Sequence, residues 1–214
     1  MIQHYSKFVY ALNNERLIPN KKKYDNTIYS FDIETTSFII YNNQVHDTNF
    51  YDKLDKKEQG KCTKHTTMYV WQLGINENVY FGRTWDDLKK FISIIDKLNE
   101  YKKIIWIHNA AFEFTYLHSI FNFCKVFARK THKVMRADFL NYNIELRCTY
   151  ILTNYSLKDL AKYNKLKVQK MSGDIDYTKL RHSMTHLTKK EFRYIENDCL
   201  IIYYYIKDIE LKKY

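Results

Sequence analysis

The stretch YSFDIETT, at residues 29–36, decides the fold of this chain. Its alternating apolar residues predict a buried β-strand that carries two acids, Asp32 and Glu34, near its end. Because side chains alternate along a strand, both carboxylates point to the same face of the sheet. Two such carboxylates repel each other and lose hydration unless a cation lies between them. The pair therefore predicts a divalent metal site, with a chance pair of acids at a strand end as the alternative.

The composition is that of a globular, basic protein. The chain has 214 residues, 45% of them hydrophobic, with four glycines and one proline. Its 35 lysines and arginines against 24 acidic residues give a net charge of +11, which favours a polyanion such as nucleic acid as partner. The alternatives are solubility alone or a codon bias. The 20 tyrosines and 13 phenylalanines exceed what one core needs, so some are candidates for stacking on unpaired bases.

Hydrophobic periodicity and capping residues predict the order of elements along the chain. Strands are expected at residues 8–12, 27–36, 68–75, 79–83, 103–107, 126–129, 133–137 and 144–148, the last three more exposed. The strands at 68–75 and 79–83 form a hairpin around residues 76–78. Helices are expected at residues 85–99, from the segment 108–114 to Ile120, at 157–164, and from Thr188 to about residue 210. Thr84, Ser156 and Thr188 are the predicted N-caps.

Two stretches lack a clear pattern. Residues 1–26 are expected to be a lead-in, and residues 41–66, rich in Asp, Lys, Asn and Thr, a long loop insertion. A further irregular, acidic turn is expected at residues 170–177. The remainder, residues 27–214, is predicted to be one α/β domain with a mixed sheet flanked by helices.

Two later motifs contain acidic residues that could act together with Asp32 and Glu34. Glu113 lies in the first turn of the helix that directly follows the buried strand 103–107, at the sheet edge where sites form. Tyr194 and Asp198 are four residues apart on the last helix and share one of its faces. Taken singly, Glu113 is also explained by the helix dipole, and the Tyr194–Asp198 pair by a surface tyrosine over a solvated acid.

Together, D-x-E on a strand, N-x-x-x-E at a strand-to-helix junction and Y-x-x-x-D on a late helix resemble the ordered motifs of DEDD exonucleases, tyrosine subtype. The segments NYSLKDL at residues 154–160 and KMSGDIDY at residues 170–177 resemble those of the proofreading domain of protein-primed family B phage DNA polymerases. The resemblance covers roughly residues 27–210. It implies a ribonuclease-H-like fold and a 3′–5′ exodeoxyribonuclease that hydrolyses phosphodiesters with two metal ions.

The resemblance also implies a role for each matching residue. Asp32, Glu34, Glu113 and Asp198 match the acids that hold two Mg²⁺ or Mn²⁺ ions. Tyr194 orients the attacking water, and Lys170 contacts the phosphate or the water and supports the tyrosine. Residues matching those that hold the frayed primer end are Thr35, Asn109, Phe112, Ser156 and Leu157, with His108 beside them.

One acid departs from the family pattern, and the position of the site lysine is not decided by the sequence. The second motif ends in Glu113 where the family usually has aspartate, which adds one methylene to the reach of the carboxylate. If the helix does not lie slightly further back, one metal ion is weakly held. Met171 and Ser172 separate Lys170 from Gly173, so Lys167 is the alternative lysine.

The expected substrate is single-stranded DNA or a primer 3′ end. Further partners implied by the resemblance are a terminal protein and a polymerase domain, which this chain lacks, so the chain is either an excised domain or a free-standing nuclease. No secretory leader or membrane-length apolar run is present, and we expect a cytoplasmic protein, in the host cell if a phage encodes it. The alternatives are a catalytically weak module that binds single-stranded nucleic acid and an exoribonuclease of the same fold.

Overall fold

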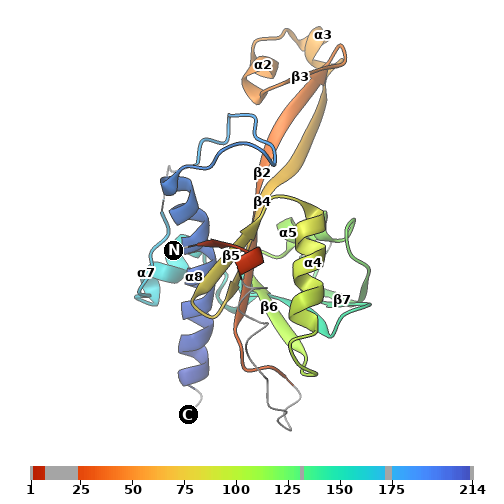
Figure 1. Cartoon of the computed structure of the whole chain (residues 1–214). Coiled ribbons are helices and arrows are strands. Elements are labelled where there is room, and N and C mark those ends of the chain that lie inside the picture. Colours follow the sequence, from red (N-terminus) through yellow and green to blue (C-terminus); the bar gives the residue numbers. More distant parts are fainter. Residues whose placement is uncertain (1, 8–23, 131–132, 172–174, 213–214) are drawn as a thin grey trace.

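The computed structural model describes residues 2–7, 24–130, 133–171 and 175–212 (Figure 1). The expected strand at residues 8–12 lies outside this part of the chain. The strands are β1 (Gln3–His4), β2 (Tyr29–Tyr41), β3 (Gln44–His46), β4 (Thr63–Ile75), β5 (Asn78–Gly82), β6 (Lys103–Ile107), β7 (Phe123–Ala128), β8 (Val134–Phe139) and β9 (Ile144–Cys148). The helices are α2 (Thr48–Asp52), α3 (Lys56–Gln59), α4 (Trp85–Asp96), α5 (Ala111–Leu117), α6 (Tyr150–Thr153), α7 (Leu157–Tyr163) and α8 (Lys189–Leu211).

The strands form one mixed sheet, as predicted. Their order is β1-β5-β4-β2-β6-β9-β8-β7, and β3 pairs with the end of β2. The strand β2 is antiparallel to β4 and parallel to β6, which in turn is parallel to β9. The strand β2 lies in the middle of the sheet, and helices cover both of its faces. This arrangement places its acidic residues under a helix rather than in open solvent.

The two faces of β2 pack against different helices. The residues Tyr29, Phe31 and Ile33 lie in the core that contains the apolar face of α4. The other face holds Ser30, Asp32 and Glu34 and lies under α8. The alternation predicted from the sequence therefore separates an apolar core on the α4 side from a polar seam on the α8 side.

The helix α8 approaches the sheet closely because small residues line its path. A Cβ atom at Gly74 of β4 would lie 2.3 Å from Oγ of Ser30 and 3.7 Å from Cβ of Cys199. The thiol of Cys199 donates to the backbone carbonyls of Ser30 and Gln72, at 3.8 and 3.7 Å. Since Asp198 precedes Cys199, this close contact fixes the position of Asp198 against β2.

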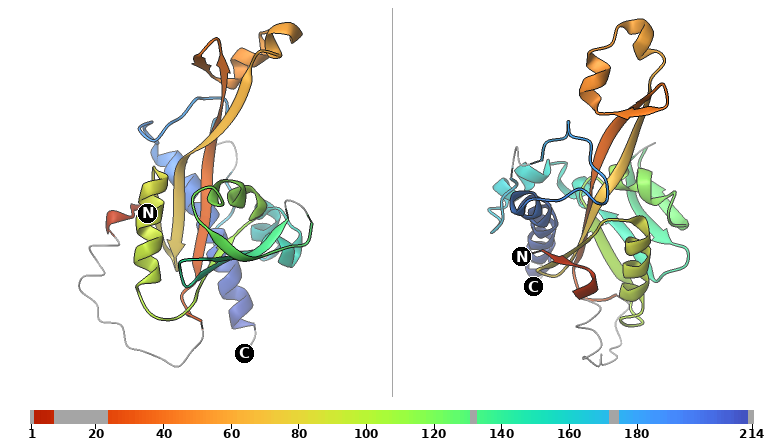
Figure 2. Two further views of the ribbon diagram at one scale, coloured as in Figure 1. Left: turned by 90° about the vertical axis from the view of Figure 1, so that its right-hand side faces the viewer. Right: turned by 45° about the horizontal axis from the view of Figure 1, so that its top comes forward.

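The expected long loop at residues 41–66 is instead an ordered arm, here called the ribbon arm and comprising residues 37–67. The pairing of β2 with β4 continues to Ile40 and Thr63, and the ribbon extends away from the body of the protein (Figures 1 and 2). At its end, Asp47 and Asp55 cap α2 and α3, two short helices that contain no buried residue. Composition alone did not reveal this arm, because strand pairing between distant segments supplies its order.

Other differences are smaller. The strands β8 and β9 are largely buried, although exposed strands were expected there, because β9 lies between β6 and β8 in the sheet. The edge strand β7 is mostly exposed, as predicted, and begins earlier than expected. The helix α4 ends at Asp96 rather than residue 99, where the buried ammonium of Lys103 donates to the carbonyls of Asp96 and Asn99. The predicted N-caps Thr84, Ser156 and Thr188 are confirmed.

Candidate functional site

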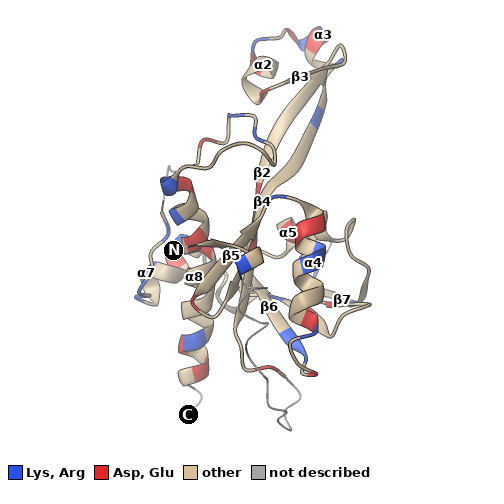
Figure 3. Cartoon of the chain, in the orientation of Figure 1, with Lys and Arg blue, Asp and Glu red and all other residues tan. Residues whose placement is uncertain are grey.

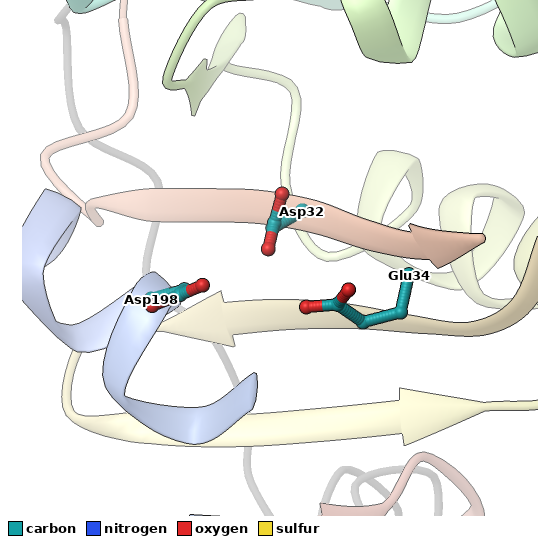
Figure 4. Close-up of side chains that lie close together, drawn as sticks. All are labelled: Asp32, Glu34 and Asp198. Carbon is teal, nitrogen blue, oxygen red and sulfur yellow. The ribbon is translucent and has the colours of Figure 1, made fainter. Parts of the chain in front are cut away.

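Three carboxylates from two elements converge on the α8 side of the sheet. Asp32 and Glu34 project from β2, and Asp198 projects toward them from α8 (Figure 4). One carboxylate oxygen from each of the three lies within 4.8 Å of the other two. Oxygen atoms at this spacing can contact a single cation, so this acid cluster could hold a metal ion.

Glu113 lies beside the acid cluster, on the side of Asp32. The strand β6 leads through Asn109, at a φ of 59°, into α5, and Glu113 lies in the first turn of that helix. Asparagine adopts this left-handed conformation more readily than most residues, which allows the tight strand-to-helix turn. Glu113 is 3% exposed, and its carboxyl lies close enough to that of Asp32 for the two groups to interact. Glu113 thus lies next to Asp32, but it is not one of the three acids whose oxygens lie within 4.8 Å of one another.

The acid cluster carries more negative charge than its surroundings neutralise. Burial, and then the charges of Asp32 and Asp198, raise the pKa of Glu34 well above its ordinary value. Burial and the charge of Asp32 raise the pKa of Asp198 to about 7, although Lys170 opposes this shift. Burial and the neighbouring Asp32 also raise the pKa of Glu113. Such groups are stabilised by taking up protons or by binding a cation.

The donor atoms fit a hard divalent cation. All four acids offer oxygen, the ligand that Mg²⁺ and Mn²⁺ prefer. Oε2 of Glu113 and Oδ1 of Asp198 are two of several buried side-chain oxygens in the described part of the chain that have no hydrogen-bond partner. Buried carboxylate oxygens are seldom left in this state, because each loses its hydration without compensation. The two atoms are therefore natural ligand positions.

Lys170 and Tyr194 lie next to the acid cluster. The ammonium of Lys170 pairs with Oδ2 of Asp198 and donates to the hydroxyl of Tyr194 at 2.7 Å. It also lies 4.0 Å from the centre of the Tyr194 ring. The alternative, Lys167, lies over the ring of Tyr204 instead, with its ammonium 5.5 Å from that ring's centre. Of the two lysines, the structure therefore brings Lys170 to the acids.

A small cavity opens over these groups. Its volume is about 240 Å³. Its lining comprises Asp32, Ile33, Glu34, Thr35, His108, Phe112, Leu157, Lys170, Tyr177, Tyr194, Asp198 and Ile202. Four of the residues predicted to hold a primer end, Thr35, His108, Phe112 and Leu157, are thus at the cavity. The ring of Phe112 is 42% exposed and free to contact a ligand there.

Asn109 and Ser156, also predicted to contact a primer end, do not line this cavity. Asn109 forms the turn before α5, and its carbonyl accepts from the amide of Phe112 at 3.0 Å. Ser156 caps α7, where its hydroxyl accepts from the amide of Asp159 at 3.1 Å. Both residues therefore shape the cavity wall indirectly, Asn109 through its backbone bond to Phe112 and Ser156 through the next residue, Leu157. His108 is at the cavity, and burial together with the charge of Lys170 lowers its pKa to about 4.

Two polar residues at the site were not singled out from the sequence. The hydroxyl of Tyr177 donates to Oε2 of Glu34 at 3.4 Å and lies 3.2 Å from the hydroxyl of Tyr194. The amide of Gln72, which pairs with Asp32 across β2 and β4, donates to Oδ2 of Asp32 at 2.7 Å. The segment GDIDY, quoted for its resemblance, ends on Tyr177 and was the available signal for that residue. Strand register was needed to find Gln72.

The fold is similar to solved structures of phi29 DNA polymerase. The complex with single-stranded DNA matches with 20% sequence identity and a TM-score of 0.57, over 87% of this chain and 32% of that chain. The ternary complex with primer-template DNA and incoming nucleotides matches with 18% identity and a TM-score of 0.59, over 87% and 31%. The post-translocation complex with primer-template DNA matches with 19% identity and a TM-score of 0.59, over 88% and 32%.

These similarities confirm the predicted α/β, ribonuclease-H-like fold. The chain spans about a third of the length of the polymerases that it matches. No family model matches the sequence, and no curated protein matches it. In the described part of the chain, no helix is long and apolar enough to cross a membrane.

Proposed function

We propose that this protein is a metal-dependent 3′–5′ exodeoxyribonuclease that removes nucleotides from single-stranded or frayed DNA 3′ ends. The observation that carries the proposal is the meeting of Asp32, Glu34 and Asp198, whose carboxylate oxygens lie within 4.8 Å of one another, with the buried Glu113 next to Asp32. These acids come from three separate elements, β2, α5 and α8. Chance acids at a strand end would not be joined by two more from distant segments.

The four acids would hold two Mg²⁺ or Mn²⁺ ions. When bound, such ions make a water more acidic and stabilise the charge that develops on the phosphate and the leaving oxygen. The structure supports this assignment through the two buried carboxylate oxygens without partners and through the raised pKa values of the acids. Both features disappear once a cation neutralises the cluster.

Tyr194 and Lys170 would position the attacking water. Burial, followed by the charge of Asp198, raises the pKa of Tyr194 above its ordinary value, so the hydroxyl keeps its proton at neutral pH. A protonated hydroxyl can orient a water but cannot act as a base. The hydrogen bond from Lys170 holds the oxygen of this hydroxyl in place, and the positive charge of Lys170 would also attract a phosphate.

The residues at the cavity rim would hold the 3′-terminal nucleotide. The exposed ring of Phe112 offers a base a surface for stacking, and Thr35 and Leu157 lie on the same lining. His108 stays neutral at physiological pH, so it would serve as a hydrogen-bonding group rather than a cation. The similar polymerase structures are complexes with single-stranded DNA and with primer-template DNA, which supports DNA as the substrate here.

The basic charge of the chain would add affinity that does not depend on sequence. Lysines and arginines are distributed over several elements, including α4, α8 and the ribbon arm, rather than gathered on one (Figure 3). Such a distribution attracts a polyanion over a broad surface. In the context of a polymerase, the activity would be proofreading, with a polymerase domain and a terminal protein as partners and the host cytoplasm as location. The domain would comprise residues 27–214, with residues 41–66, in the ribbon arm, as its insertion.

A second candidate is a module that binds single-stranded nucleic acid with little catalysis. One observation favours it: the ammonium of Lys170 already pairs with Asp198 and partly neutralises the acid cluster without a metal ion. If this pair persists, the second ion would be weakly held. The module would then retain Phe112 and the other rim residues for binding.

A nuclease assay separates these candidates. We expect the protein with Mn²⁺ or Mg²⁺ to release mononucleotides from the 3′ end of a labelled single-stranded oligodeoxynucleotide, and Asp32→Ala to abolish this release while DNA affinity stays nearly unchanged. Undiminished cleavage by Asp32→Ala would refute the mechanism. Tight binding without release by the unaltered protein would favour the binding module, and preferred cleavage of the matching RNA would indicate an exoribonuclease.

A further inference from the structure

A segment that leads into α8 crosses the strand that carries the acids. This segment, here called the strap, comprises residues 175–187 and runs from the cavity over the ribbon formed by β2 and β4 (Figure 1). It contains no helix or strand. A segment of this length has no regular backbone hydrogen bonds of a helix or strand. It therefore needs other specific contacts to hold one conformation.

Thr36 of β2 and Arg83, which directly follows β5, hold the middle and the far end of the strap. The hydroxyl of Thr36 donates to the carbonyl of Lys179 at 3.1 Å and accepts from the amide of Arg181 at 3.1 Å. The guanidinium of Arg83 donates to the carbonyls of His182 and Thr185, both at 2.9 Å. The strap is therefore bonded to the sheet through its backbone, only two residues beyond Glu34 on β2.

The buried side chain of Arg181 connects the strap to α8. Its side chain is almost fully buried, and its guanidinium pairs with the carboxylate of Glu191 and lies 5.5 Å from the centre of the Tyr69 ring. The same carboxylate of Glu191 accepts from the amide of Thr188 at 2.8 Å and so completes the cap of α8. One arginine thus connects the strap to the beginning of the helix that carries Tyr194 and Asp198.

Arg181 also fixes the backbone next to the cavity. A second nitrogen of its guanidinium donates to the carbonyl of Asp176 at 2.5 Å, and Asp176 directly precedes Tyr177. The hydroxyl of Tyr177 lies between Glu34 and Tyr194. Arg181 therefore holds the residue next to Tyr177, which is the only strap side chain among the described residues that lines the cavity.

A buried ion pair is a poor source of stability, because the cost of desolvating both charges offsets their attraction. Such a pair is better explained by the conformation that it specifies. Here that conformation places the Tyr177 hydroxyl between one metal-binding acid and the water-positioning tyrosine. The Arg181–Glu191 pair connects the strap to α8. The relative position of these two segments determines whether Tyr177 contacts Tyr194.

We propose that Arg181 is a positioning residue for the cleavage reaction, which acts by holding the strap so that Tyr177 aligns Glu34 with Tyr194. This inference rests on the proposed nuclease function, since alignment of these groups matters only if they act on a substrate. Loss of Arg181 lowers kcat and leaves KM nearly unchanged, because the rim residues that hold the nucleotide belong to other elements.

The test compares Arg181→Met, Arg181→Lys and Thr36→Val with an exposed control on α8, Arg193→Met. Thr36→Val removes the second anchor of the strap without leaving a buried charge unpaired, so it remains informative if Arg181→Met fails to fold. Hydrogen exchange of the strap amides measures the anchoring itself, independently of any nuclease activity. We expect exchange at the strap to rise about tenfold or more in the three anchor variants and to stay unchanged in Arg193→Met.

Kinetics then test whether the anchor acts through Tyr177. We expect kcat to fall about 10–100-fold in Tyr177→Phe and in Arg181→Lys, and the double variant to be no slower than the slower single one. Fully additive losses, or unchanged strap exchange in both Arg181→Lys and Thr36→Val, would overturn the inference. If the unaltered protein cleaves nothing, the proposed function fails and the positioning role fails with it, whereas normal cleavage with an unaltered kcat in the anchor variants refutes the positioning role alone.

Discussion

The ammonium of Lys170 donates a hydrogen bond to the hydroxyl of Tyr194 at 2.7 Å while it pairs with the carboxylate of Asp198. One lysine thus contacts both members of the Y-x-x-x-D motif. It fixes the tyrosine oxygen and, in the same position, would compete with a metal ion for Asp198. Under the proposed function, these two effects would act in opposite directions, the first favouring cleavage and the second weakening metal binding.

Lys170→Met therefore separates metal binding from catalysis. We expect a higher affinity for Mn²⁺, because the acid cluster loses a neighbouring positive charge, and a cleavage rate lower by about 10–100-fold, because Tyr194 loses its anchor. Titration with Mn²⁺ and single-turnover cleavage measure the two quantities. Lys167→Met is the matched control, since Lys167 lies over Tyr204 and away from the cavity. An unchanged rate in Lys170→Met would contradict this role.

Glu113→Gln tests the departure from the family motif. The substitution keeps the shape of this buried side chain but replaces a carboxyl, which can ionise and bind a cation, with a neutral amide. We expect the melting temperature at pH 8 without metal to be equal or higher, and the increase on adding Mn²⁺ to be smaller. Each tenfold loss of metal affinity reduces that stabilisation by about 1.4 kcal/mol. Thermal unfolding with and without Mn²⁺ measures it, with the exposed Glu100→Gln as control; an equal metal-induced increase would exclude Glu113 from the metal site.

Phe112→Ala tests the stacking surface at the cavity. The ring is 42% exposed at the rim and contributes no acid or hydroxyl to the site. Loss of a base-stacking ring costs about 1–3 kcal/mol, so we expect KM for a single-stranded oligonucleotide to rise about 5–100-fold with a smaller effect on kcat. Steady-state kinetics provide the measurement. Tyr163→Ala removes a ring that is 62% exposed on α7, outside the cavity, and is expected to change neither constant. A loss confined to kcat would indicate another role for Phe112.

Glu191→Gln tests the pH dependence of stability. Burial raises the pKa of Glu191, but the hydrogen bonds from Thr188 and the charge of Arg181 outweigh burial and leave the pKa below its ordinary value. A lowered folded-state pKa stabilises the protein above the unfolded-state pKa, about 4.3, and this stabilisation is lost as the pH falls through the folded-state value. We expect Glu191→Gln to cost about 2 kcal/mol at pH 7 and to make unfolding less dependent on pH below about 4.3.

Urea unfolding at several pH values measures this effect. Glu210→Gln, an exposed acid near the end of the same helix, serves as control and is expected to leave the profile unchanged. A parallel shift of the whole profile, with the same acid dependence as the unaltered protein, would show that the charge of Glu191 does not contribute.

Removal of the end of the ribbon arm tests its independence from the site. Replacing residues 41–62 with Asn-Gly joins the paired residues Ile40 of β2 and Thr63 of β4 by a tight turn. Because α2 and α3 contain no buried residue, we expect the melting temperature and the affinity for Mn²⁺ to remain nearly unchanged. Calorimetry and metal titration check both. A large loss of metal affinity would show that the arm supports the acids on β2.

Much of the secondary structure could be predicted because it depends on neighbouring residues. The alternation in β2 and the caps of α4, α7 and α8 act over a few positions, and the structure confirms each of them. The prediction of a loop at residues 41–66 was wrong. The order of this segment comes from strand pairing such as that of Ile40 with Thr63, which are far apart in the chain. Composition carries no information about such pairing.

The sequence by itself determined that Asp32 and Glu34 share a face of a strand and that Glu113 lies in the first turn of a helix. It also determined that Tyr194 and Asp198 share one face of the last helix. These are consequences of the periods of strands and helices, which need no partner. Only the tertiary structure decided that Gln72 bonds to Asp32, that Tyr177 lies between Glu34 and Tyr194, and that Arg181 anchors the strap. Each of these contacts depends on strand register or on a segment folding back across the sheet, and both are set by the packing of the whole domain.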